Sequence, residues 1–190
     1  MIDTNSNYLM TINGQATAET STKPVYNPAT KQVIAEVPDC TNEQFEAAVA
    51  SSKNAFNSWS ATPIEERQAI VARLGDMLEE QAGEFMALLT REQGKPAAGS
   101  EWEVYGSAAW LKAIATQSLP EETIEDNDER KVITRYTPLG VVGAIVPWNF
   151  PLLLAVWKIA PALVAGCTLV LKPSPYTPLC DLKFVELAQQ

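Results

Sequence analysis

Residues 140–175 read GVVGAIVPWNFPLLLAVWKIAPALVAGCTLVLKPSP, and this stretch decides the fold of the chain. An apolar, β-branched run at 141–146 is followed by a proline-flanked loop, a long apolar segment and a second strand-like run at 168–171. This order predicts a strand, a loop, a helix and a strand, the βαβ unit of a parallel α/β sheet. Ligands bind outside the carboxyl ends of such strands. Asn149, in the loop, and Lys172, where the second strand stops, are therefore the first candidates for a functional site.

The composition indicates a globular chain and excludes several classes of protein. A net charge of −9 argues against nucleic acid as a partner, because nucleic acid requires a basic face. The run at 136–157 carries no charge, but its prolines and glycines fit a strand–loop–helix unit better than a membrane span. Residues 1–15 lack the basic and apolar regions of a signal peptide.

Cysteine and histidine usage limits the chemistry further. Three cysteines, Cys40, Cys167 and Cys180, form an odd set without paired spacing, which favours a reducing, cytoplasmic setting over a disulfide framework. The chain has no histidine, so the usual metal ligand and the usual general base are both missing, and we predict no metal site. Cys167 reads as a small buried residue. A helix dipole would favour a thiolate at Cys180, but the adjacent Asp181 opposes it.

The rest of the chain divides into an N-terminal part at 1–118, a hairpin at 119–137 and the βαβ segment at 138–190. Residues 1–40 look extended, with turns at TINGQ and NPATKQ. The last helix begins at Thr177 and has no residue that would end it before Gln190.

Three amphipathic helices are expected between residues 41 and 116. Thr41 and Gln44 form a capping box for the first helix, with an apolar stripe at Phe45, Ala48, Val49, Ser52, Phe56 and Trp59. Thr62 is expected to cap the second helix with Pro63 at its first position and Glu65 completing the box, and its stripe runs through Val71, Leu74, Leu78, Phe85 and Leu89 to Gly94. The third, at 98–116, is expected to bury Trp102, Tyr105, Ala109 and Trp110.

Each candidate residue has a plain structural alternative. Prolines on both sides fix the backbone around Asn149, so its amide could act as a preorganised donor to a developing negative charge, or it could simply satisfy the loop backbone. The Lys172 ammonium could bind a ribose hydroxyl or a phosphate, or it could be a solvated lysine at a strand end. No GxGxxG sequence is present, so the ordinary dinucleotide fingerprint is absent.

The stretch PLGVVGAIVPWNFPLLLAVWKIAPALVAGCTLVLKPSPYTPL closely resembles the aldehyde dehydrogenase superfamily, whose members oxidise aldehydes to carboxylic acids with NAD or NADP. The PWNFP loop and the LKPS ending are highly specific when they occur together at this spacing. The ING and NPAT motifs and the EQGKP helix end are similar to the family as well. The resemblance covers nearly all of this chain but less than half of a typical member.

The resemblance implies a role for each candidate. Asn149 would be the side-chain donor of the oxyanion hole. Lys172 would contact the adenosine ribose, with Ser174 and Pro175 beside it. The nicotinamide–ribose side of the cleft would be lined by Ile145, Val146, Pro147 and Trp148. The fold would be the first portion of a Rossmann-like parallel-sheet cofactor domain with N-terminal helices and a protruding oligomerisation hairpin, and the full-length form would be a homo-oligomer acting on a small-molecule aldehyde.

The chain departs from the family's pattern at two points. NAD-preferring members often carry a glutamate three residues after the lysine, and here that position is Pro175, which leaves NADP or NAD open as the cofactor. The family's nucleophilic cysteine, which forms the thiohemiacetal, and its glutamate base map onto no residue here. The 190-residue chain alone is therefore expected to be inactive. An aldehyde-dehydrogenase-like binding or assembly subunit without catalysis is the alternative, and a stand-alone nucleotide-binding module is a third possibility.

Overall fold

The computed structural model describes residues 8–17 and 21–190. The strands in this part of the chain are β1 (Met10–Ile12), β2 (Gln15–Thr17), β3 (Thr22–Tyr26), β4 (Val33–Pro38), β5 (Glu122–Asp126), β6 (Lys131–Thr134), β7 (Val141–Ile145) and β8 (Thr168–Lys172). The helices are α1 (Asn42–Ala61), α2 (Ile64–Glu80), α3 (Ala82–Gln93), α4 (Ala97–Ile114), α5 (Pro151–Val164) and α6 (Leu179–Leu187).

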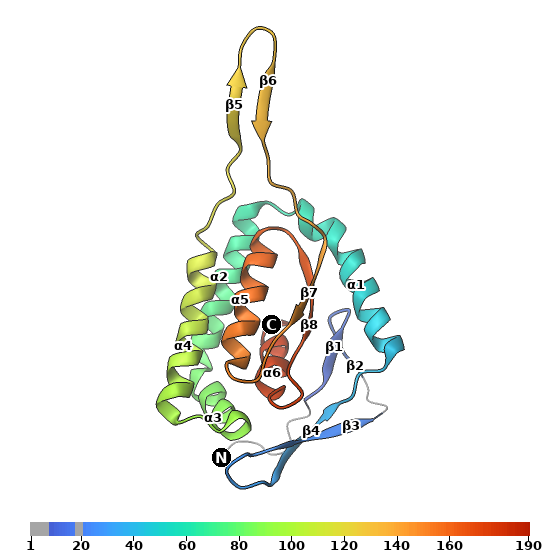
Figure 1. Cartoon of the computed structure of the whole chain (residues 1–190), viewed down its shortest axis with the longest axis vertical. Coiled ribbons are helices and arrows are strands. Elements are labelled where there is room, and N and C mark those ends of the chain that lie inside the picture. Colours follow the sequence, from blue (N-terminus) through green and yellow to red (C-terminus); the bar gives the residue numbers. More distant parts are fainter. Residues whose placement is uncertain (1–7, 18–20) are drawn as a thin grey trace.

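The predicted βαβ unit forms the centre of the molecule. β7 and β8 pair in parallel, from Val141 opposite Thr168 to Ile145 opposite Lys172, and α5 makes the crossover between them. In Figure 1, α2 and α4 lie beside α5, and α1 lies on the other side of the two strands. α5 is apolar on nearly every face because it packs against α4, α2 and α6 as well as the strands. The α/β class predicted from the sequence is confirmed.

The N-terminal segment forms two antiparallel hairpins, as the turn residues predict. β1 and β2 are joined by Asn13 and Gly14, which both have positive φ (56° and 69°), the backbone of a two-residue hairpin turn. β3 and β4 are joined through Asn27, whose side-chain oxygen accepts from the amides of Ala29 and Thr30. The prediction of an extended segment also covered residues 1–7 and 18–20, which lie outside the described residues.

The capping box predicted for α1 is present. The Thr41 hydroxyl accepts from the Gln44 amide at 3.2 Å, and the Gln44 side chain accepts from the Thr41 amide at 3.0 Å. The predicted stripe is half-buried from Ala48 to Trp59, whereas Phe45 is exposed. The Trp59 indole donates to the carbonyl oxygen of Leu163, which ties α1 to the end of α5.

Replacing Thr41 with alanine is expected to lower the free energy of unfolding by about 1 kcal/mol, because the Gln44 amide loses its acceptor at the helix N-terminus. Urea unfolding of this chain measures the change, and Thr41→Ser, which keeps the acceptor, should unfold like the parent. An equal loss for both variants would show that the hydroxyl is not what stabilises the helix end.

The cap predicted for the second helix is wrong. α2 begins at Ile64 with Pro63 in the capping position, and no side chain caps it. The Thr62 hydroxyl instead donates to the carbonyl oxygen of Ser58 in the last turn of α1. The expected single helix is also interrupted at Gln81, which separates α2 from α3. Its predicted end is confirmed, because Gly94 closes α3 with a left-handed φ of 82°.

The buried face predicted for α4 is wrong. Trp102, Tyr105, Ala109 and Trp110 are exposed, and the buried face consists of Ser100, Glu103, Val104, Ser107, Ala108 and Leu111. The reason is close helix packing: a Cβ added to Gly75 of α2 would lie 3.1 Å from the carbonyl oxygen of Ala108. α4 therefore turns its small residues toward α2 and its aromatic residues outward.

The predicted hairpin is formed by β5 and β6, which pair antiparallel and extend away from the body of the molecule (Figure 1). α6 spans Leu179–Leu187 and residues 188 and 189 follow it as a turn, whereas the sequence predicts a helix from Thr177 to Gln190. Within the described ranges, no helix combines the length and the apolar character needed to cross a membrane.

Candidate functional site

The carboxyl ends of β7 and β8 lie side by side, as the sequence predicts. Ile145 is paired with Lys172, and the amide of Val146 donates to the carbonyl oxygen of Lys172 at 3.2 Å. Parallel pairing brings the segments that follow both strands to one edge of the sheet. We call residues 145–149 and 172–176, together, the carboxyl edge.

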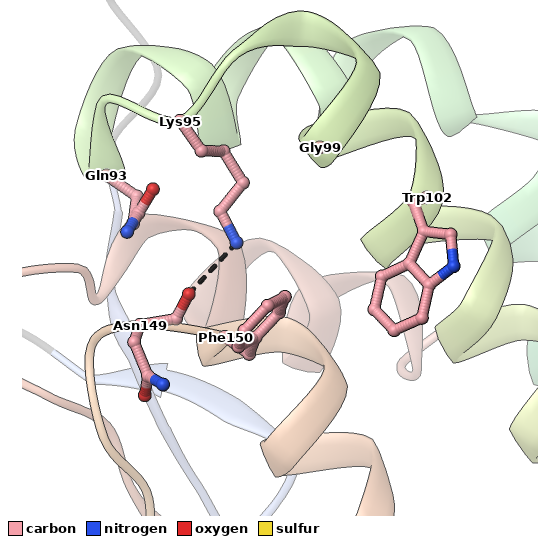
Figure 2. A pocket seen from close by; sticks show the side chains of 6 residues that line it. All are labelled: Gln93, Lys95, Gly99, Trp102, Asn149 and Phe150. Carbon is pink, nitrogen blue, oxygen red and sulfur yellow. Dashed lines mark hydrogen bonds between the residues drawn. The ribbon is translucent and has the colours of Figure 1, made fainter.

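The loop between β7 and α5 carries Asn149 on the surface. Val146 is buried and anchors the loop, whereas Trp148 and Asn149 are exposed. The Thr177 hydroxyl donates to the carbonyl oxygen of Trp148 at 3.4 Å and so ties this loop to the segment after β8. The Asn149 side chain points away from Lys95 (Figure 2), and its amide makes no hydrogen bond within residues 8–17 and 21–190. Both N–H groups of that amide are therefore free to donate to a ligand.

The segment after β8 presents some of its candidate residues and buries others. Lys172 and Pro175 are exposed, and Ser174 is buried. The Ser174 hydroxyl accepts from the Tyr176 amide at 3.3 Å, so this side chain shapes the turn. The charge that the carboxyl edge offers to solvent thus comes from the Lys172 ammonium.

Three large apolar side chains of the carboxyl edge are strongly exposed to solvent. Ile145 is 76% exposed, Tyr176 is 73% exposed and Trp148 is 54% exposed. Apolar surface concentrated at strand ends marks a contact with a ligand or another protein segment. The edge therefore combines flat apolar surface, one ammonium and one free amide.

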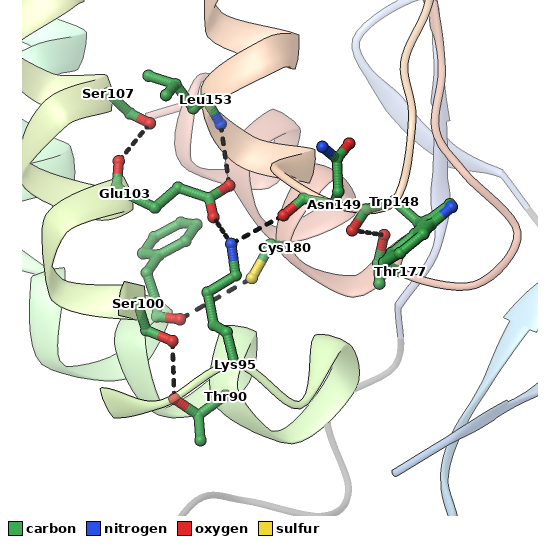
Figure 3. Close-up of polar contacts among 11 residues, drawn as sticks. Thr90, Lys95, Ser100, Glu103, Ser107, Trp148, Asn149, Leu153, Thr177 and Cys180 are labelled. Carbon is green, nitrogen blue, oxygen red and sulfur yellow. Dashed lines mark hydrogen bonds and ion pairs between the residues drawn. The ribbon is translucent and has the colours of Figure 1, made fainter. Parts of the chain in front are cut away.

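A charged pair that the sequence analysis missed lies behind the Asn149 loop. The Lys95 ammonium forms an ion pair with Glu103 and donates to the carbonyl oxygen of Asn149 at 3.0 Å (Figure 3). It also lies 4.2 Å from the centre of the Phe150 ring, which Figure 2 shows beside it. These contacts border a shallow hollow of about 390 Å³, shown in Figure 2, which is lined by Gln93, Lys95, Gly99, Trp102, Asn149 and Phe150.

The sequence contained a signal for this pair. The EQGKP helix end by itself indicates no partner for Lys95. Glu103 nevertheless shares the spacing of Ser100, Ser107 and Leu111 along one face of α4, so a charged residue had to be buried with a partner.

Cys180 is not activated as a nucleophile. Cys167 and Cys180 are both buried. Burial raises the pKa of the Cys180 thiol well above its usual range, and the nearby Glu92 carboxylate raises it further, so these effects outweigh the dipole of α6. Cys180 is therefore a protonated thiol at neutral pH, which agrees with the expectation that it is not a nucleophile.

Known proteins match the chain over almost its whole length. The model of the aldehyde dehydrogenase family matches residues 15–190. Phenylacetaldehyde dehydrogenase of Pseudomonas fluorescens is 42% identical, over 95% of this chain and 39% of that protein. The NAD+ complex of an aldehyde dehydrogenase from Bacillus cereus superposes with a TM-score of 0.93 at 35% identity, covering 97% of this chain and 39% of that one. An NADP-dependent enzyme of E. coli superposes with a TM-score of 0.92 at 32% identity, over 96% and 39%.

The chain therefore spans 39% of the length of these relatives. Within that span, the sequence match, the backbone superposition and the parallel strand–helix–strand unit agree with one another. The resemblance of the PWNFP and LKPS segments is confirmed, and the chain belongs to the aldehyde dehydrogenase family.

Proposed function

We propose that this chain supplies the cofactor edge and the oxyanion donor of an aldehyde dehydrogenase that oxidises aldehydes to carboxylic acids with NADP or NAD. The observation that carries the proposal is the free, solvent-facing side-chain amide of Asn149. It lies on the loop that follows β7, and the last residue of β7 is paired with Lys172. In this role the amide donates to the carbonyl oxygen of the aldehyde and stabilises the negative charge that develops when a nucleophile attacks the carbonyl carbon.

The residues of the carboxyl edge fit a dinucleotide. The exposed faces of Ile145 and Trp148 suit a flat ring and its ribose, and Pro147 lies between the loop residues that would contact them. The Lys172 ammonium suits a ribose hydroxyl or a phosphate. The bound cofactor would supply the hydride acceptor. The residues of this chain would hold it at the strand ends and exclude water there.

The nucleophilic cysteine and the base would come from outside residues 1–190. The test compares this chain with the complete enzyme that carries it, using an aldehyde panel and both cofactors. We expect the 190-residue chain to bind NADP or NAD without oxidising an aldehyde, and the complete enzyme to turn over. A complete enzyme that binds neither cofactor and oxidises no aldehyde would contradict the proposal.

Cofactor choice is expected to depend on Pro175. Pro175→Glu places a carboxylate near Lys172, which would accept from ribose hydroxyls and repel a 2′-phosphate. We expect the ratio of NAD affinity to NADP affinity to rise by about tenfold, measured by calorimetry on this chain. Pro120→Glu adds the same charge before the hairpin and should leave the ratio unchanged.

The cofactor preference of the parent enzyme, with Pro175 unchanged, is a separate test. We propose that the parent accepts NADP at least as well as NAD, because no carboxylate stands three residues after Lys172. Turnover with NADP about a hundredfold poorer than with NAD would contradict this, whatever Pro175→Glu does.

The hairpin supports a second role, in assembly. Ile124, Ile133 and Tyr136 are 60%, 40% and 62% exposed on an arm that extends from the body. Exposed apolar side chains on paired strands suit a contact with another subunit. We further propose that the full-length form is a homo-oligomer in the cytoplasm, in which the hairpin at 119–137 contacts another subunit. In the sequence this hairpin lies between the parts at 1–118 and 138–190. If the chain is only an assembly subunit, it will bind full-length enzyme without binding either cofactor.

A further inference from the structure

We propose that Lys95 is a positioning residue that fixes the direction of the Asn149 amide, with Glu103 holding Lys95 in place. The proposal rests on the oxyanion role of Asn149 proposed above. The Lys95 ammonium bonds the main-chain carbonyl of Asn149 and lies over the Phe150 ring, while the Asn149 side chain points away from it (Figure 2).

The contacts of Lys95 act on two successive residues of the loop. Its side chain is only 9% exposed, and its ammonium has three N–H donors. One contact is the carbonyl oxygen of Asn149, at 3.0 Å, and another is the face of the Phe150 ring, at 4.2 Å from its centre. Fixing the carbonyl of Asn149 and the ring that follows it fixes the peptide from which the Asn149 side chain projects.

Glu103 connects this lysine to the helix that follows the loop. Its side chain has no exposed surface. One carboxylate oxygen pairs with Lys95, and the other accepts from the amide of Leu153, in the first turn of α5, at 3.2 Å. The Ser107 hydroxyl donates to the main-chain oxygen of Glu103 one turn further along α4. Lys95, just before α4, and Glu103, on α4, therefore hold the chain from the Asn149 carbonyl to the first turn of α5.

Stability alone does not explain a buried pair at this position. Replacing a buried ion pair with apolar residues of similar volume is often neutral or stabilising, since desolvation offsets the attraction. What the pair adds is direction, because an apolar side chain cannot bond the Asn149 carbonyl. A donor displaced by about 1 Å loses much of its effect on a reacting atom.

The first experiment measures the loop in this chain. The variant Lys95→Met/Glu103→Gln removes both charges together, and the amide oxygen at position 103 can still accept from Leu153. We expect the NMR order parameter of the Asn149 side-chain amide to fall in this variant. Lys112→Met removes a lysine of α4 that pairs with Asp76 and Glu79 on the surface, and it should leave the order parameter unchanged.

The second experiment measures turnover in the complete enzyme. The double variant is expected to lower kcat by about tenfold to a hundredfold with little change in KM or cofactor affinity. In an Asn149→Ala background the same double variant should lower kcat no further, because it acts through Asn149.

The outcomes separate this inference from the function on which it rests. If Asn149→Ala leaves kcat unchanged, the oxyanion role fails and the positioning role fails with it. If Asn149→Ala lowers kcat, the oxyanion role stands and the positioning role can fail by itself. It fails if Lys95→Met/Glu103→Gln leaves the order parameter or kcat unchanged. It also fails if adding these two substitutions to Asn149→Ala lowers kcat further.

Discussion

Replacing Asn149 with alanine is expected to lower the kcat of the complete enzyme by about 10²–10³-fold, the usual effect of removing one oxyanion donor. The amide is free of other hydrogen bonds in the described part of the chain, so its loss leaves no buried partner unsatisfied and should not unfold the loop. The carbonyl of residue 149 still accepts from Lys95, because a main-chain oxygen is present in alanine as well. The loss should therefore appear in kcat, while the affinity for NADP or NAD stays near that of the parent.

Asn54→Ala is the matched control. Asn54 lies exposed on α1, away from the carboxyl edge, and its replacement should leave kcat and cofactor affinity as they are. Turnover that survives Asn149→Ala but disappears on mutation of Cys167 or Cys180 would contradict both the oxyanion role and the inert state assigned to these thiols.

The sequence predicted those parts of the fold that depend on short-range signals. The βαβ unit followed from two β-branched runs around a long apolar segment, and the capping box at Thr41 followed from its spacing to Gln44. The same local signals placed Asn149 and Lys172 at one edge, because the carboxyl ends of parallel strands always meet.

The errors arose where tertiary contacts override local preference. The aromatic residues of α4, such as Trp102 and Trp110, look like a core stripe, but close approach at Gly75 requires small residues on the inner face. The Thr62 hydroxyl bonds Ser58 in the helix before it rather than capping the helix after it, as its spacing to Glu65 predicts. The pairing of Lys95 with the Asn149 carbonyl joins residues far apart in the sequence, so no local pattern could reveal it.

A second large effect is expected in the pH dependence of folding, and it originates at Glu92. This side chain is buried at the N-terminus of α6, where its oxygens accept from the amides of Leu179 and Cys180 at 2.7 and 2.9 Å. Burial raises the pKa of Glu92 to about 7, and the two amide donors reduce the shift without cancelling it. Asp181 is buried beside it with no hydrogen-bond partner for either oxygen among the described residues, and burial raises its pKa well above the usual range.

The sign of the effect follows from proton binding. A carboxyl group whose native pKa lies above its unfolded value of 4.5 binds more protons in the native state at intermediate pH. The stability that Glu92 contributes is therefore fully present below pH about 4.5 and is lost as the pH rises through about 7. Between pH 5.5 and pH 8 the loss is on the order of 2 kcal/mol, and Asp181 contributes with the same sign.

Urea unfolding at pH 5.5 and pH 8 checks this, by the difference in unfolding free energy between the two conditions. The glutamine in Glu92→Gln cannot ionise. Between pH 5.5 and pH 8 this variant should therefore lose about 2 kcal/mol less unfolding free energy than the parent. Asp181→Asn should change the difference in the same direction, whereas Glu101→Gln, on the exposed face of α4, should not change it. If Glu92→Gln instead made the chain lose more stability toward pH 8, the bonds from Leu179 and Cys180 would have to outweigh burial, and Glu92 would act as an ionised cap of α6 at neutral pH.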